Sequence, residues 1–93
     1  MDMRFNLDPS GDPHIWDHNV SEKEVAEALA HPLESIRGRG TSVIAIGLTA
    51  AGRYLKVIYS PDDSGDDIFV VTAFDVPPKQ IRALKQRLKR RRP

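Results

Sequence analysis

Hydrophobic residues recur along the chain with two different periods. The first set, in residues 21–33, has the spacing of an amphipathic helix of about three turns. Its members are Val25, Ala28, Leu29 and Leu33. Ser21 precedes Glu24 by three residues, a capping-box pattern that indicates where the helix begins. The His31-Pro32 pair indicates its end, because the residue before a proline is biased away from helical backbone angles.

Alternating apolar residues farther along predict the strands of an antiparallel sheet. Segments 42–48, 53–60 and 67–76 have this pattern, and turns of hairpin length separate them. Residues 34–40 predict one further short strand and a loop. The segment 67–76 is the most apolar, so we expect it to be the central strand. The sequence therefore predicts an α+β fold, with N-terminal helices packed on a twisted antiparallel sheet of three to four strands and a helix after it.

The two ends of the chain have different compositions. Residues 1–13 are rich in turn-forming residues and predict a flexible N-terminal arm, which leaves 14–93 as a single domain. A short helical stretch is expected at 14–19, where Asn19 can end it because asparagine tolerates left-handed backbone angles. Its Trp16 is expected to anchor this stretch in the core.

The last segment is a basic helix. Pro77 and Pro78 suit a first helical turn, and Asp75 is a candidate cap. Residues 77–93 carry eight of the fourteen basic residues and no acid, so this segment has a formal charge of +8, whereas residues 1–76 have −7. A segment so basic favours contact with a polyanion or an acidic partner. The alternative is that it keeps the protein soluble or folds back on its own acidic body.

Composition narrows the chemistry. The chain has no cysteine, which excludes disulfides, thiol catalysis and cysteine-based metal sites. No apolar run resembles a signal peptide or a membrane span, so we expect a cytoplasmic protein without membrane contact. His14 and His18 could share a helix face, but no third ligand lies at motif spacing, so no metal and no cofactor is expected. One of these histidines remains a candidate general base.

Four cations come from three neighbouring predicted elements. Arg37 and Arg39 lie in the strand and loop of 34–40, and Arg53 and Lys56 lie in the strand of 53–60. If the strands pair in order, these side chains could converge near one face of the sheet, where they would bind phosphate. The alternative is that they only protect edge strands from aggregation.

Several runs, in order, resemble one known family. Residues 14–21 resemble the H-x-x-x-H-G-V-S helix junction of BrnT-like proteins in the RelE/ParE-type toxin superfamily, with Asn19 in place of the glycine. The remaining similar runs are 24–32, 44–47, 52–55 and 70–73. The resemblance thus covers roughly residues 14–90, and it rests on the order and spacing of the runs.

The resemblance implies a RelE-like fold and the function of an mRNA-cleaving, metal-independent endoribonuclease, the toxin of a bacterial type II toxin–antitoxin system. Its partners would be RNA, including ribosome-bound mRNA, and a cognate acidic antitoxin. Such an enzyme activates the ribose 2′-hydroxyl against the adjacent phosphate, which requires a base and cations. Arg53 and Lys56 best match the family's basic residues, with Lys56 or His18 as base and Arg39 as a further phosphate ligand. The helix residues expected to bind RNA are Lys79, Arg82, Lys85 and Arg87.

The chain also departs from the family pattern. Phe74 stands where many members have an arginine in the last strand, and Gln80 stands where they have an acid. Loss of one preorganised cation can cost on the order of 10²–10³ in rate. This departure favours the alternative function, a non-catalytic module of the same fold that binds RNA or a protein partner. A third hypothesis is a toxin of the gyrase-directed branch.

Overall fold

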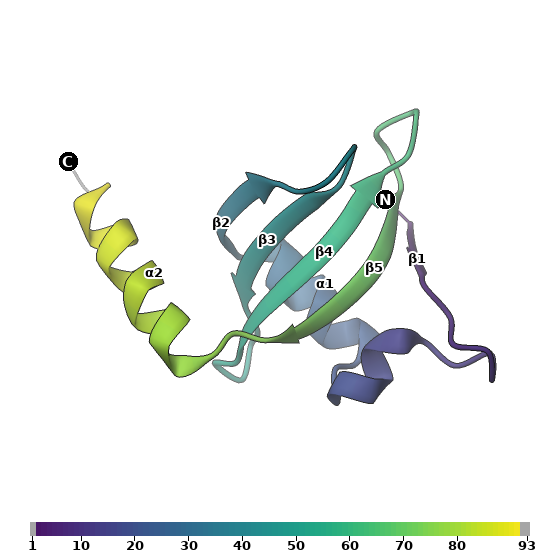
Figure 1. The fold of residues 1–93 in the computed structure, drawn as a ribbon, viewed down its shortest axis with the longest axis horizontal. Helices are drawn as coiled ribbons and strands as arrows, with labels where there is room; N and C mark the ends of the chain where they lie inside the picture. Colours follow the sequence, from purple (N-terminus) through teal and green to yellow (C-terminus); the bar gives the residue numbers. More distant parts are fainter. Residues whose placement is uncertain (1, 92–93) are drawn as a thin grey trace.

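The chain forms one N-terminal α-helix, a five-stranded, mostly antiparallel sheet and a C-terminal helix (Figure 1). This confirms the α+β class. The structure is a computed structural model that describes residues 2–91, so Arg92, counted above among the basic residues, lies outside the described residues. The elements are β1 (Met3–Phe5), the 3-10 helix η1 (His14–His18), α1 (Glu22–Ala30), β2 (Pro32–Arg37), β3 (Val43–Leu48), β4 (Tyr54–Pro61), β5 (Ile68–Asp75) and α2 (Pro78–Arg90).

The strand order is β1-β5-β4-β3-β2, in which only β1 pairs parallel to its neighbour. The sheet thus has five strands where the sequence predicted three to four. The expected central position of the last strand is also wrong, because β4 occupies the middle. Strand β5 is nevertheless interior, between β1 and β4, which accounts for its apolar composition.

The additional strand comes from the segment predicted to be a flexible arm. Met3 and Phe5 are partly buried against the main core, and the strand that carries them pairs with the start of β5. A bridge between Leu7 and Pro13 closes the intervening turn. Three residues are too few for an alternating pattern to identify a strand from sequence. Whether Met3 and Phe5 become buried depends on the residues that they contact in the folded protein.

The helix boundaries follow local chemistry, with one exception. The Ser21 side chain accepts a hydrogen bond from the Glu24 backbone N–H, and the Glu24 carboxylate accepts one from the Ser21 N–H, so the capping box is confirmed. Asn19 ends η1 with a φ of 57°, in the left-handed region, as expected. Asp75 does not cap α2, however. The cap position is Pro77, and the Asp75 carboxylate binds Arg53 instead.

The two faces of the sheet carry separate apolar clusters. Helix α1 packs on one face, where Leu55 and Val57 are fully buried. It approaches so closely that a methyl group at Gly47 would overlap the backbone carbonyl of Ala28. Helix α2 packs against the other face through Leu84, which is also fully buried.

The expected core role of Trp16 is wrong. Its side chain is exposed, and its indole N–H donates a 2.6 Å hydrogen bond to the carboxylate of Glu22. Ile15, the preceding residue, anchors η1 in the core in its place. Within residues 2–91, no helix is both long enough and apolar enough to cross a membrane.

Candidate functional site

The face of the sheet opposite α1 is only partly covered. Strand register assigns side chains to it, because directly paired residues share a face. One row across the sheet is Glu34, Ile46, Lys56 and Phe74, and the next is Ile36, Ile44, Ile58 and Thr72. Helix α2 covers the end of this face near Ile46 and Tyr54 and leaves Ile36 exposed. We call this side of the molecule the open face.

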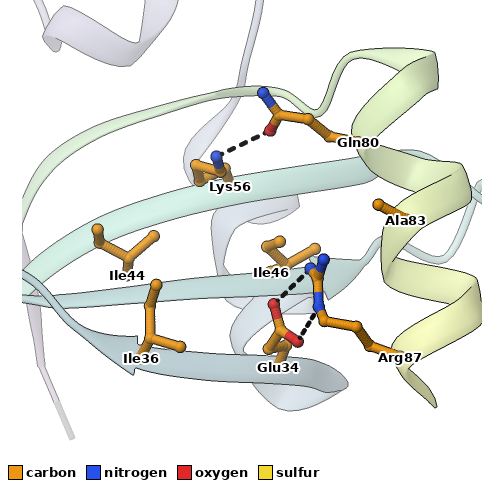
Figure 2. A pocket seen from close by; sticks show the side chains of 8 residues that line it. All are labelled: Glu34, Ile36, Ile44, Ile46, Lys56, Gln80, Ala83 and Arg87. Carbon is orange, nitrogen blue, oxygen red and sulfur yellow. Dashed lines mark hydrogen bonds and ion pairs between the residues drawn. The ribbon is translucent and has the colours of Figure 1, made fainter. Parts of the chain in front are cut away.

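A pocket of about 250 Å³ lies where α2 meets the open face (Figure 2). Three isoleucines of the sheet form its apolar surface, and its polar side chains come from both the sheet and α2. The lining residues are Glu34, Ile36, Ile44, Ile46, Lys56, Gln80, Ala83 and Arg87. An apolar surface with a few polar groups is the usual composition of a site that binds an organic ligand.

Lys56 lies at one side of this pocket. Its ammonium group donates a 3.0 Å hydrogen bond to the side-chain oxygen of Gln80, so strand β4 and helix α2 hold it from two sides (Figure 2). Gln80 is a neutral amide, so within residues 2–91 no ion pair balances the lysine charge. An ammonium group has three donors, so Lys56 keeps donor capacity for a phosphate.

Arg87 and Glu34 close the other side of the pocket. The guanidinium of Arg87 donates two hydrogen bonds of 2.8 Å to the Glu34 carboxylate, and Arg91 adds a third of 3.3 Å. These bonds, those from Arg87 first, lower the pKa of Glu34 although partial burial opposes the shift. Arg87, expected from sequence to bind RNA, is therefore occupied in clamping α2 to β2. The Glu34 side chain, only 9% exposed, was missed because strand register alone brings it under the helix.

The remaining cations of α2 face solvent. Within residues 2–91, no ion pair involves any of the five exposed basic side chains Lys79, Arg82, Lys85, Lys89 and Arg90. Lys85 lies over the ring of Tyr54, with its nitrogen 5.7 Å from the ring centroid. The structure thus joins part of the basic helix to an aromatic residue of the open face.

Arg53 lies on the opposite face from Lys56. Its guanidinium donates to the carboxylates of Asp75 and Glu24 at 2.6–3.1 Å and to the backbone carbonyls of His18 and Asn19 at 3.3 and 2.8 Å. The hydrogen bonds that Arg53 donates to Asp75 are the chief cause of the raised pKa of Arg53, and the same bonds lower the pKa of Asp75. The side chain is 24% exposed. Arg53 therefore ties η1 and α1 to the sheet, and its expected position beside Lys56 is wrong.

The two arginines of the predicted loop do not join Lys56 either. Arg37 ends β2, and Arg39 lies in the following hairpin, where its carbonyl accepts hydrogen bonds from the Ser42 backbone and side chain. Strand pairing places this hairpin three residues along β3 from the Lys56 row, about 10 Å away. The expected convergence of the four cations is therefore wrong, since alternation and register separate them.

His18 approaches the open face from the side of β5. Its exposed ring lies with its centroid 5.9 Å from that of Phe74, and Phe74 is the cross-strand partner of Lys56. Beyond residue 70, β5 has no β1 partner, and η1 packs there. Two of the sequence candidates, His18 and Lys56, are thus neighbours of the same aromatic residue, one by ring contact and the other by strand pairing.

Comparison with known proteins does not extend this description. No family model matches the chain, and no curated protein or solved structure is significantly similar to it.

Proposed function

We propose that this protein binds single-stranded RNA across the open face and the solvent side of α2. The observation that carries the proposal is the combination of cations and aromatic rings there. Lys56 is the cross-strand neighbour of Phe74, and Lys85 lies over Tyr54. Unpaired bases stack on aromatic side chains while lysines contact the phosphates between them, which is the usual basis of single-strand binding.

The charge distribution supports the same surface. The cations of α2 that face solvent are available to phosphates, whereas Arg53 and Arg87 are neutralised by carboxylates. Only part of the basic segment therefore contributes to RNA affinity. The helix would add sequence-independent attraction, and the open face would contribute the contacts to bases.

The α+β class of the fold is the one that the resemblance implies. An N-terminal helix on one face of an antiparallel sheet, followed by a basic C-terminal helix, is what a RelE-like, BrnT-like toxin would have. We therefore include in the proposal that the chain is the toxin of a type II toxin–antitoxin system. Its cognate antitoxin would cover the exposed Ile36 and the neighbouring Ile44 with apolar side chains and meet the surrounding cations with acidic ones.

RNA cleavage is a second candidate function, favoured by the position of His18. A base at His18 would take the proton of a ribose 2′-hydroxyl, and the 2′-oxygen would then bond to the adjacent phosphorus. The bond from phosphorus to the 5′-oxygen would break, and that oxygen would take up a proton. Lys56 would stabilise the charge that develops on the phosphate. Arg53 has no part in this step, because its donors are committed on the other face.

Binding can be tested by fluorescence anisotropy with a labelled single-stranded RNA of about 12 nucleotides. We expect the double variant Lys56→Ala/Lys85→Ala to bind at least about 10-fold more weakly than wild type, since it loses two phosphate contacts. The matched control is Lys23→Ala, which removes an exposed lysine from α1 on the other face. Equal affinity of the double variant and wild type, or an equal loss in the control, would contradict the proposal.

Cleavage needs a separate test. Wild type and His18→Ala are expressed under induction, and new RNA ends are mapped by primer extension, with His31→Ala as control. The nuclease function predicts ends that appear with wild type and His31→Ala and disappear with His18→Ala. If wild type produces no new RNA ends, cleavage is refuted. RNA binding is tested separately, by the anisotropy measurement.

A further inference from the structure

A second cluster of side chains lies outside the proposed RNA-binding surface, where the N-terminal turn meets η1. The Nδ1 atom of His14 lies 3.1 Å from a carboxylate oxygen of Asp8 and 3.6 Å from one of Asp17. The ligand atoms of the three residues all lie within 4.8 Å of one another. Asp8 and His14 are partly buried, and Asp17 is exposed.

Local structure explains why the three residues meet. His14 and Asp17 are three apart on a 3-10 helix, which has three residues per turn, so their side chains lie on the same side. Asp8 comes from the turn before η1. The His14 backbone N–H donates to the Asn6 carbonyl at 2.8 Å, and the Asp8 N–H donates to the Asp12 carbonyl at 2.7 Å. Backbone bonds therefore bring Asp8 against the helix before any ligand arrives.

We propose that Asp8, His14 and Asp17 form a binding site for one zinc ion. Tetrahedral zinc with nitrogen and oxygen ligands at about 2.0–2.1 Å places neighbouring ligand atoms about 3.3 Å apart. The separations of 3.1 and 3.6 Å from His14 bracket that value, and the two carboxylates lie within 4.8 Å of each other. On binding, the ion would replace the hydrogen bond between His14 and Asp8 and draw the two carboxylates together. Exposed Asp17 leaves an open approach, and water completes the fourth position.

The chemistry of the ligands selects the ion. Magnesium and calcium prefer ligand sets made of oxygen alone, whereas an imidazole nitrogen suits zinc and its transition-metal neighbours. Two carboxylates balance the charge of the ion, and the imidazole binds in its neutral form. Without an ion, His14 keeps its 3.1 Å hydrogen bond to Asp8 beside Asp17, and this is the outcome against which the site must be tested.

The proposed site would link the N-terminal turn to η1. The His14 ring lies edge-on to the ring of His18, with centroids 5.3 Å apart, so zinc would also restrain the segment that presents His18. The open face itself contributes no ligand. Zinc binding and RNA binding are therefore separable, and failure of one leaves the other intact.

Isothermal titration of tag-free protein with Zn²⁺ in a non-chelating buffer tests the site. We expect one ion per chain, and a loss of affinity in His14→Ala and in Asp8→Asn. Altering outer-shell groups costs about 10–100-fold in metal affinity, and loss of a direct ligand should cost no less. His31→Ala, which removes an exposed histidine at the end of α1, should bind as wild type does.

Further measurements distinguish a variant that has lost a zinc ligand from one that has failed to fold. In EDTA, wild type and Asp8→Asn should both be folded at room temperature. In thermal melts, Zn²⁺ should raise the midpoint of wild type alone. The absorption of Co²⁺-loaded protein should show the strong bands of a tetrahedral site in wild type and lose them in His14→Ala. Absence of zinc binding, binding that survives His14→Ala, an equal loss in His31→Ala, or equal affinity for Mg²⁺ would each overturn the proposal.

Discussion

The two faces of the sheet differ in how completely they are covered, and β4 shows the difference residue by residue. Leu55 and Val57 face α1 and are fully buried in the main core. Lys56, between them, faces the other way, into a pocket that α2 covers only in part. Because side chains alternate along a strand, consecutive residues serve different purposes. The role of a basic residue in such a strand therefore cannot be assigned until the face on which its side chain lies is known.

Arg53 and Lys56 are the clearest pair for this comparison. Arg53 makes hydrogen bonds to two carboxylates and two backbone carbonyls, so it joins four segments of the chain. Within residues 2–91, the side chain of Lys56 makes one hydrogen bond, to the neutral amide of Gln80. From sequence, both were candidates for the same phosphate. In the structure, Arg53 is bound by two carboxylates, whereas Lys56 is bound by a neutral amide and keeps further donors.

The largest expected effect contrasts the apolar residues of the two faces. Leu55→Ala should lower the free energy of unfolding by about 2–5 kcal/mol, since it leaves a cavity in a closely packed core. Ile36→Ala, at a side chain 55% exposed on the open face, should change it by no more than about 0.5 kcal/mol. Urea unfolding followed by circular dichroism measures both. Similar losses would mean that the open face is as well packed as the other.

The next contrast is between the two cations. Arg53→Ala should cost about 1–3 kcal/mol of unfolding free energy, because Glu24 and Asp75 lose their charged donor. Lys56→Ala should leave stability nearly unchanged and weaken RNA binding instead. Paired urea melts and anisotropy titrations separate the two effects. A stable Arg53→Ala that loses RNA binding would reverse the assignment of the two faces.

The ion pairs that Arg53 makes with Glu24 and Asp75 should also affect how the protein responds to acid. The pKa of Asp75 is lowered chiefly by Arg53, and that of Glu24 chiefly by the Ser21 backbone N–H and also by Arg53. A carboxyl group whose pKa is lower in the folded state stabilises the fold above its ordinary pKa of about 4, and this contribution is lost as pH falls through the lowered value.

We therefore expect wild type to lose stability steeply below about pH 4 and Arg53→Ala to lose less over that range. Urea midpoints at pH 7 and pH 3 compare the two proteins, with Lys23→Ala as the control. Equal losses of stability in wild type and Arg53→Ala would show that the ion pairs of Arg53 contribute nothing to the acid response. Glu34 keeps its lowered pKa in every variant, since Arg87 is its main cause.

Local rules predicted much of this fold. The capping box, the left-handed Asn19 and the strand segments of β3 to β5 all depend on residues close in sequence, and the structure confirms them. Strand β1 could not be predicted in this way. Its three residues become a strand only because β5 offers a free edge beside a core that accepts Met3 and Phe5.

The candidate site was less predictable for the same reason. The cations Arg53 and Arg87 were identified, but their roles depend on the distant acids Asp75 and Glu34, which only tertiary structure brings to them. The meeting of His18 with Phe74 likewise depends on where β1 ends. The residue types indicated that cations for binding phosphate were present. The pairing of the strands determined which of these cations are bound to carboxylates and which are not.

The smallest expected effect contrasts single lysines on the two sides of the molecule. Lys89→Gln removes one exposed, unpaired charge from α2, and Lys23→Gln removes one from α1. If α2 lies on the RNA backbone, the first change should reduce the slope of log affinity against log salt by roughly 0.7, the value for one phosphate of a single strand. The second should leave that slope unchanged, because the α1 face points away from the RNA. Anisotropy titrations at several salt concentrations measure both slopes. A smaller slope in both variants would mean that RNA responds to the overall charge of the protein, and the division between the two faces would then not extend to binding.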